Sequence, residues 1–394
     1  MTITEESATI ENQTPNAERF NYTQQYPVRI AHIIGKLRNG GVESVVMNYY
    51  RNIDREKIQY DFIIDDDSEN PELQSEIVNL GGKVITVPAY QKQFAYQKAL
   101  HELFRENNYL LVYSHINTLS VFPLFAAWRA GIKIRVAHNH STAGGGELKR
   151  NIMKYSLRPF AKVFPTHLCA CSKFAGEWLF GKSAMNSGRV KVWPNAIDTS
   201  RFAYNESIRN DIRRELKLEG KFVVGHAGRF VQTKNHDFLI DIFNEIHKRR
   251  SDSVLLLAGD GPLMDSVKDK VFRLGLNDSV IFMGDVHGMG RYYQAMDIFI
   301  LPSLYEGLGM VAVEAQVSGL PVLCSDEVPN EAVICNNIKF LSLKRSAGEW
   351  ADESLRFSEN HVRCDMSDAA REHGFDIREQ ALKLQEWYCG LLGI

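Results

Sequence analysis

The most constraining feature of the sequence is a set of continuous apolar runs, each followed by a segment with helical periodicity. The runs form two series, separated by a stretch around Asn195. Strands that are apolar on both faces are typical of parallel sheets covered by helices on both sides, so we expect an α/β fold. The runs lie at 28–34, 60–64, 83–88, 110–115 and 132–140 in the first series, and at 221–230, 253–262, 280–286, 296–303 and 321–326 in the second.

Two such series in a chain of 394 residues predict two domains. Residues 1–26 lack periodic hydrophobicity, and we interpret them as a flexible tail. The first domain is expected at 27–195 and the second at 196–374, with a final helical segment at 375–394 returning to the first domain. Two sheets of this kind facing each other create a cleft, and their ligands bind at the carboxyl ends of the strands.

Composition and charge exclude several classes of function. Lys and Arg total 46 and Asp and Glu total 48, a net charge of −2, which argues against general nucleic-acid binding. None of the six cysteines forms a CxxC pair, so we expect no zinc site, no disulfide framework and a reducing compartment. The polar start lacks a signal-peptide pattern, and the longest apolar stretch, 121–128, is too short for a bilayer. We expect a cytoplasmic protein, or one peripheral on the cytoplasmic face.

The string PSLYEGLGMVAVEAQVSGLPV at 302–322 is the most specific chemical signal. Gly307 and Gly309 leave backbone amides uncovered at the start of a predicted helix, where phosphate binds readily. Glu306 precedes those amides and is suited to hydroxyl groups beyond the phosphate. Glu314, eight residues later, is suited to a vicinal diol such as ribose. The alternative is that Glu306 only caps the helix and that Glu314 lies on the surface.

A second signal is GHAGRFVQTKNH at 225–236, directly after a predicted strand. Arg229 and Lys234 provide two fixed cations that would neutralise a diphosphate leaving group without a metal ion. The alternative is a pair of solvated surface charges.

Glycines and histidines in the first domain give weaker signals. Gly40 and Gly41 follow the first strand, where they either let a substrate approach the backbone or form a plain turn. His115, His138 and His140 end two successive strands and are expected to face the cleft, with a purely structural role as the alternative.

Two further segments carry patterns that resemble ligand sites. AGDGPL at 258–263 lacks the spacing of a dinucleotide-binding motif. Asp65, Asp66 and Asp67 form a DxD pattern, which we interpret as a solvated loop rather than a metal site because this half of the chain carries no other metal signature.

The segment 147–164 is predicted to be a basic amphipathic helix. Ile152, Met153, Leu157 and Phe160 alternate with cations, a pattern suited to an anionic membrane surface. An ordinary exposed helix is the alternative. The cations are Lys149, Arg150, Lys154, Arg158 and Lys162.

With these motifs, the chain resembles the retaining glycosyltransferases of family 4, which have the two-domain GT-B fold, over about residues 28–390. Within the family it is similar to bacterial exopolysaccharide glycosyltransferases of the EpsF type. The Glu306–Glu314 string carries the resemblance most specifically, and VWPNAIDTSRF at 192–202 is similar to the family's bridge between domains. Ala196 stands there where glycine is usual.

The resemblance implies a transferase that moves a hexose or N-acetylhexosamine from a UDP-sugar to a saccharide or lipid-linked saccharide, with no metal and no other cofactor. Its acceptor would enter over the first domain. A front-face displacement is the expected route, in which the departing phosphate takes the acceptor proton. The residues implied are Val286 for the base, Glu314 for the ribose, Arg229, Lys234 and the amides of Leu308 and Gly309 for the diphosphate, Glu306, Gly307 and His115 for the sugar, and Gly40 and Gly41 in the glycine loop.

Two other functions remain open at this point. A nucleotide-sugar 2-epimerase of the same two-domain architecture would break the same anomeric bond without an acceptor. A sugar-binding protein without chemistry is the third possibility, although such proteins are usually exported. The EGLGM string at 306–310 favours the transferase.

Overall fold

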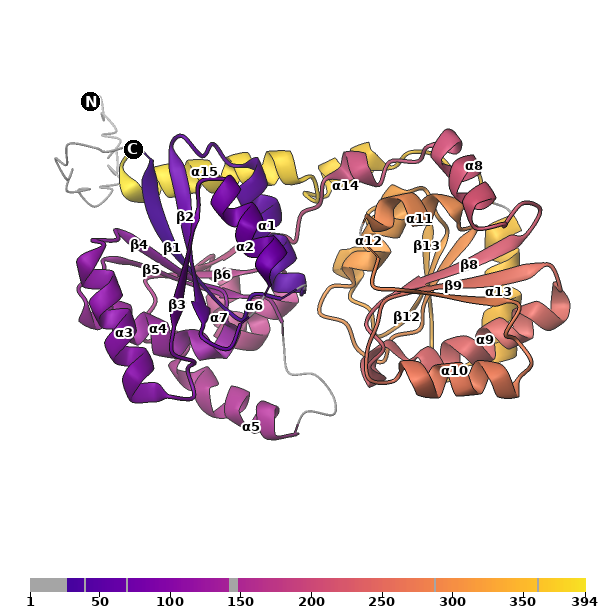
Figure 1. Cartoon of the computed structure of the whole chain (residues 1–394), viewed down its shortest axis with the longest axis horizontal. Coiled ribbons are helices and arrows are strands. Elements are labelled where there is room, and N and C mark those ends of the chain that lie inside the picture. Colours follow the sequence, from indigo (N-terminus) through magenta and orange to yellow (C-terminus); the bar gives the residue numbers. More distant parts are fainter. Residues whose placement is uncertain (1–26, 39, 69, 142–147, 287, 360) are drawn as a thin grey trace, which may run out of the picture.

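The computed structural model describes residues 27–394 apart from 39, 69, 142–147, 287 and 360. The predicted tail at 1–26 lies outside the described residues. Two α/β domains lie next to each other (Figure 1). No helix among the described residues is long and apolar enough to cross a membrane.

Within the described residues, the first domain is built on a seven-stranded parallel sheet with the order β3-β2-β1-β4-β5-β6-β7. Apolar residues fill both faces of this sheet, as expected for strands without polar alternation. The strands are β1 (Val28–Gly35), β2 (Ile58–Asp65), β3 (Lys83–Val87), β4 (Leu111–Ser114), β5 (Ile134–Asn139), β6 (His167–Ala170) and β7 (Val190–Val192). The helices are α1 (Gly41–Asn52), α2 (Pro71–Asn79), α3 (Gln93–Glu106), α4 (Val121–Arg129), α5 (Leu148–Leu157), α6 (Lys173–Phe180) and α7 (Lys182–Asn186).

The second domain repeats this design with a six-stranded parallel sheet in the order β10-β9-β8-β11-β12-β13. Both of its faces are also apolar and covered. The strands are β8 (Phe222–Ala227), β9 (Ser253–Ala258), β10 (Val280–Gly284), β11 (Ile298–Leu301), β12 (Val322–Ser325) and β13 (Ile338–Leu341). The helices are α8 (Glu206–Glu215), α9 (His236–Arg249), α10 (Met264–Arg273), α11 (Met289–Ala295), α12 (Met310–Val317), α13 (Ala347–Glu359) and α14 (Ser367–Glu372). The last helix, α15 (Ile377–Leu392), packs on the first domain.

The α/β prediction is confirmed, but three strands were not predicted. We expected the second sheet to end at 321–326, whereas β13 adds an edge strand beyond it. In the first sheet, neither β6 nor β7 was predicted. The missed strands have only three or four residues, and each contains a polar residue, His167, Lys191 or Lys339, so none has a long apolar run.

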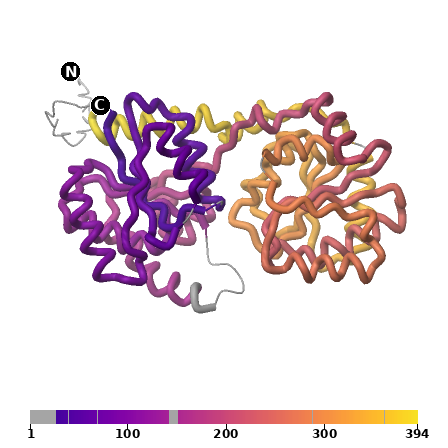
Figure 2. The backbone as a smooth tube through the Cα atoms, viewed as in Figure 1, coloured from indigo at the N-terminus to yellow at the C-terminus, as the bar shows by residue number. Residues whose placement is uncertain are grey.

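Two chain segments connect the domains, and they lie side by side. Ile197 forms a parallel bridge with Asp376, and the Thr199 hydroxyl donates to the Asp376 carboxylate at 2.7 Å. After this bridge α15 runs along the first domain (Figure 2), and its residues Leu384 and Tyr388 are buried in that domain's core. The last helix therefore covers one face of the first sheet.

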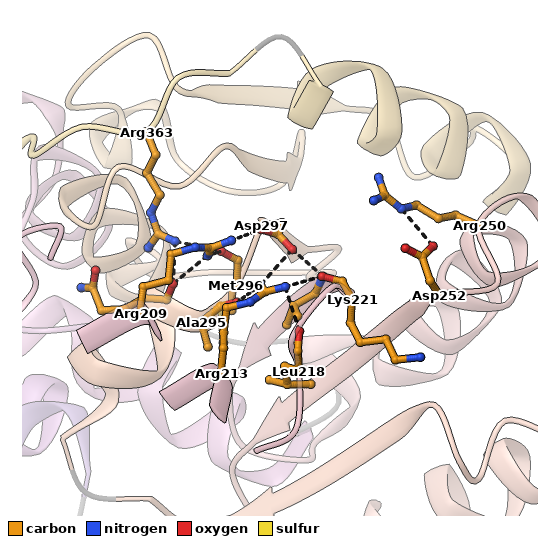
Figure 3. A network of polar contacts seen from close by, with 12 residues as sticks. Arg209, Arg213, Leu218, Lys221, Arg250, Asp252, Ala295, Met296, Asp297 and Arg363 are labelled. Atoms are coloured by element: carbon orange, nitrogen blue, oxygen red, sulfur yellow. Dashed lines mark hydrogen bonds and ion pairs between the residues drawn. The ribbon is translucent and has the colours of Figure 1, made fainter. Parts of the chain in front are cut away.

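Three arginines hold the C-terminal end of α11 in the second domain (Figure 3). Arg209 and Arg213 come from α8, and Arg363 follows α13. Together they donate to the backbone carbonyls of 294–296, and Arg209 and Arg213 also pair with Asp297. Because the carbonyls at a helix C-terminus lack intrahelical donors, these guanidinium groups satisfy them and fix α8 and the 360s segment to the sheet.

Candidate functional site

Lys234 and Glu306 form an ion pair at the carboxyl ends of two neighbouring strands. Their loops follow β8 and β11, which pair in parallel, so residues far apart in the sequence meet at one edge of the sheet. The Lys234 Nζ lies 2.7 Å from Glu306 Oε1. The Ser303 hydroxyl donates to the same oxygen at 2.7 Å. The Glu306 carboxylate is buried. Its two donors, Lys234 and Ser303, hold it in one orientation.

The turn between Arg229 and Lys234 is shaped by glycines that the sequence analysis did not single out. A side chain at Gly228 would lie 3.2 Å from the methylenes of Lys234, so this glycine makes room for the lysine. Gly259 and Gly261, in the AGDGPL loop, come so close to the backbone of 228–230 that a Cβ would clash with it. That loop is therefore a packing element beside the cationic turn.

Arg229 is exposed at the end of β8, on the same turn as Lys234. Its guanidinium group makes no hydrogen bond or ion pair with any of the described residues. A cation held by the backbone at this edge, but without an acidic partner, is available to an anionic ligand.

The start of α12 lies directly after Glu306. Gly309 is the N-cap and has a φ of +81°, a left-handed conformation that favours glycine. The first N–H groups of a helix have no intrahelical partner, and the helix dipole places partial positive charge there. Gly307 and the buried Leu308 connect this helix start to Glu306, so amides and cations are brought together.

Glu314 lies one turn further along α12 and accepts a hydrogen bond from the Tyr293 hydroxyl at 2.8 Å. It is partly buried rather than on an open surface, and desolvation raises the pKa of its carboxyl to about 7. Tyr293 was not identified from the sequence, where it gives no signal beyond an apolar helix position. Val286 is partly exposed and packs against the same core as Tyr293.

The glycine loop of the first domain is placed at the start of α1. Gly40 is the N-cap of that helix, and a side chain at Gly41 would meet nothing within 4 Å. Gly41 therefore borders open space. Neither residue is required by a close backbone contact within the described part of the chain.

The three predicted histidines do come together, and a fourth joins them. His115 Nε2 lies 2.9 Å from His32 Nδ1, and His115 Nδ1 lies 3.0 Å from His140 Nε2. His138 stacks on His140, and its Nδ1 shares a hydrogen bond of 2.9 Å with the Tyr113 hydroxyl. His32 was missed because it lies inside the apolar run of β1. Nitrogens of His115, His138 and His140 lie within 4.8 Å of one another, a spacing that would suit a metal ion.

The DxD segment is not the fully solvated loop that we expected. Asp65 is buried at the end of β2, and burial raises its pKa to about 6. Asp66 accepts from the Ala89 amide and pairs with Lys92, and Asp67 pairs with Lys36. The carboxylates of Asp66 and Asp67 therefore bind partners within the first domain.

The loops of the two domains approach each other at this edge. A Cβ on Gly307 would lie 3.9 Å from the carbonyl oxygen of His140, and the Phe174 amide donates to Glu331 across the domains at 3.3 Å. The cationic turn and the helix start of the second domain therefore face the strand ends that carry the histidines.

The comparisons with known proteins identify the family. The Glycosyltransferase Family 4 model matches residues 39–201, and the model for Glycosyl transferases group 1 matches 207–373. EpsF of Bacillus subtilis (strain 168), which is named as a glycosyltransferase, is 33% identical to this chain over 335 residues. The match covers 83% of this chain and 87% of EpsF. An Escherichia coli galactosyltransferase acting on GlcNAc-diphosphoundecaprenol is 22% identical, with 93% and 97% covered.

Solved structures agree on the architecture. HepE of Anabaena in complex with UDP has a TM-score of 0.75 at 20% identity, with 92% of this chain and 100% of HepE covered. The sucrose-phosphate synthase of Thermosynechococcus elongatus has a TM-score of 0.72 at 17% identity, with 93% and 99% covered. The predicted GT-B fold is thereby confirmed. Together with the family models and the identity to EpsF, this places the chain in glycosyltransferase family 4.

Proposed function

We propose that this chain is a retaining, metal-independent transferase that moves a hexose or N-acetylhexosamine from a UDP-sugar to a saccharide acceptor in exopolysaccharide or capsule synthesis. One observation carries the proposal: Arg229 and the Lys234–Glu306 pair lie at one sheet edge beside the start of α12. The structural neighbour HepE was solved with UDP-glucose, which supports a donor of this class.

The electrostatics of this edge suit a nucleoside diphosphate. Arg229 is exposed without an acidic partner in the described structure, and Lys234 is held 2.7 Å from Glu306. The diphosphate would meet both cations and the amides of Leu308 and Gly309, so the charge that develops on departure would be stabilised by preorganised donors. The base would lie by Val286, with the ribose on Glu314.

The sugar would meet Glu306 and Gly307 on one side and His115 on the other. The Glu306 carboxylate is already engaged by Lys234 and Ser303, which supports a binding role rather than a nucleophilic one. In the front-face route that we propose, the bond from the anomeric carbon to the diphosphate breaks as the bond to the acceptor oxygen forms on the same face. The acceptor proton passes to the leaving phosphate oxygen.

The donor class is tested by incubating the protein with a panel of nucleotide-sugars in the presence of EDTA. We expect a UDP-sugar to raise the thermal midpoint and to release UDP when a saccharide acceptor is added, because the cations replace a metal ion. Formation of an epimerised UDP-sugar without acceptor would instead indicate the 2-epimerase. Loss of activity in EDTA that manganese restores would contradict the metal-independent site.

The exposed apolar side chains on α5 and just after it are the basis for proposing a lipid-linked acceptor. On α5 and the residues after it, four large apolar side chains are exposed, Ile152, Tyr155, Phe160 and Val163, and we call them the α5 patch. Lys162 lies among them and is also exposed. Apolar groups flanked by cations are suited to shallow insertion into an anionic membrane. The E. coli relative acts on an undecaprenol-linked sugar, which supports this acceptor class.

We expect the protein to bind vesicles containing phosphatidylglycerol at low salt and to leave them at high salt. Each Lys or Arg near an anionic surface contributes about 1 kcal/mol, so replacing Lys149, Arg150 and Lys154 by Glu should weaken binding by roughly 100-fold or more. Co-sedimentation measures the effect.

The control for vesicle binding is Phe272→Glu, which alters a side chain that is 72% exposed on α10 of the second domain. It should bind vesicles like the wild type. Transfer to a short water-soluble acceptor should be unchanged in the triple variant. A wild-type protein that ignores anionic vesicles at low salt would show that the α5 patch is only an exposed helix face.

A further inference from the structure

Three histidine rings in the first domain lie end to end. The ring centroids of His32 and His115 are 5.2 Å apart, and those of His115 and His140 are also 5.2 Å apart. The facing nitrogens are 2.9 and 3.0 Å apart, so each pair shares one hydrogen bond. The first two rings are nearly coplanar, with planes 14° apart. The three side chains form what we call the imidazole chain.

The chemistry of neutral imidazole makes the imidazole chain act as one unit. Each neutral ring has one N–H donor and one acceptor nitrogen, and both nitrogens of His115 are already used. If His32 donates to His115, then His115 must donate to His140. If His140 donates to His115, then His115 must donate to His32. The tautomer of His115 is therefore set by its two neighbours.

Both ends of the imidazole chain are buried and lack a partner in the described structure. The free atoms are His140 Nδ1 and His32 Nε2. His32 borders a small pocket of about 20 Å³ that Tyr60, Trp193 and Tyr388 also line. A pocket of this size has room for a single water, which would donate or accept and so would serve either direction of the chain.

Packing and burial hold these rings in place and uncharged. His32 stacks on Tyr60 at a centroid distance of 3.7 Å, and His115 stacks on Tyr113 at 4.6 Å. Burial lowers the pKa of His32 and of His140 to about 3, and that of His115 lies well below its ordinary value. The rings are thus neutral at physiological pH.

We propose that His32 and His140 are positioning residues that fix the tautomer and ring orientation of His115 through the imidazole chain. This rests on the proposed placement of His115 against the donor sugar. A hydrogen-bonded chain explains the geometry better than a metal site, because a metal would need the lone pairs that now face a shared proton. His138 stands outside the chain, bonded to Tyr113.

The test compares two substitutions at His32. Asn places a polar atom near the position of Nδ1, whereas Phe keeps the ring shape and removes the hydrogen bond. We expect His32→Phe to lower kcat by tenfold or more with the donor KM within about twofold, and His32→Asn to recover most of the loss. His140→Phe and His140→Gln repeat the comparison at the other end, where Gln replaces Nε2. Thermal unfolding identifies variants that do not fold.

Nitrogen-15 NMR of labelled histidines gives a readout independent of activity. The wild type should show one protonated and one bare nitrogen on His115 from pH 6 to 8, and His32→Phe should change the tautomer ratio. An unchanged kcat and an unchanged His115 tautomer in both Phe variants would overturn the proposal. So would Zn²⁺ binding that shifts His115, His138 and His140 together. A fully active His115→Ala with the same NMR result for His32→Phe would refute the sugar contact of His115 instead.

Discussion

Replacing Lys234 by alanine is expected to lower turnover by roughly 10²–10³, or about 3–4 kcal/mol, the usual cost of removing one preorganised group that stabilises developing charge. The Lys234 side chain is 19% exposed and lies 2.7 Å from Glu306. Its removal takes one cation from the leaving phosphate and leaves the buried carboxylate with only the Ser303 hydroxyl. Steady-state kinetics with saturating acceptor measure the loss.

Arg229→Ala separates catalysis from stability. The Arg229 side chain is exposed and makes no hydrogen bond or ion pair with the described residues, so we expect a similar loss of turnover with an unchanged free energy of unfolding. Lys234→Ala, by contrast, should also lower stability, because breaking a buried ion pair leaves one charge without its partner. The two variants are expected to differ in stability because only Lys234 has a carboxylate partner, Glu306.

The matched controls follow from the same geometry. Arg273→Ala removes an exposed cation from the end of α10 and should leave kinetics and stability as they are. Adding Glu306→Gln to Lys234→Ala should restore part of the stability but no activity. If Arg229→Ala or Lys234→Ala keeps more than half of the wild-type turnover, these cations do not stabilise the leaving diphosphate as proposed.

The sequence predicted the fold where strands are long and uniformly apolar. β8 and β9 each have six buried residues, and such runs leave no choice but a doubly covered strand. β6, β7 and β13 were missed because an edge or near-edge strand of three or four residues needs little apolar surface, and its pairing partners supply the rest. The stability of such strands comes from tertiary contacts, which local patterns do not contain.

Site residues were predicted one by one, but their contacts were not. Lys234 and Glu306 were each placed after a strand, and adjacent parallel strands bring those ends together. Their direct pairing depends on loop conformation, including the room at Gly228, and no spacing rule gives it. His32 gave no signal because a buried polar residue within an apolar run looks the same whether it supports packing or a neighbouring side chain.

Stability of the whole protein is expected to fall steeply as the pH drops from about 6.5 towards 4. Burial lowers the pKa of His32 and His140 to about 3 and that of His236 to about 4. Burial shifts the pKa values of His115, His138, His167 and His226 in the same direction. Below pH 6.5 the unfolded chain binds protons on these groups while the folded chain does not. Their contribution is therefore complete above pH 6.5 and is lost on acidification.

Three carboxyl groups act in the opposite sense. Burial raises the pKa of Glu314 to about 7, that of Asp65 to about 6, and also that of Glu43, so the folded state holds protons that the unfolded state has released. Their contribution grows as the pH falls towards 4.5. Each shifted group changes stability by at most about 1.4 kcal/mol per pH unit, so seven histidines outweigh three carboxyls by several kcal/mol per unit.

Urea unfolding followed by circular dichroism at pH 8, 7, 6 and 5 measures this slope. Domains are commonly stable by only about 5–15 kcal/mol, so a loss of several kcal/mol per unit should unfold the protein near pH 5. His32→Asn removes one of the groups and should flatten the slope by about 1.4 kcal/mol per unit. His373→Asn, at an exposed histidine after α14, should not change it. Equal stability at pH 7 and pH 5 would mean that these rings gain protons in the folded state, and the neutral imidazole chain would then be wrong as well.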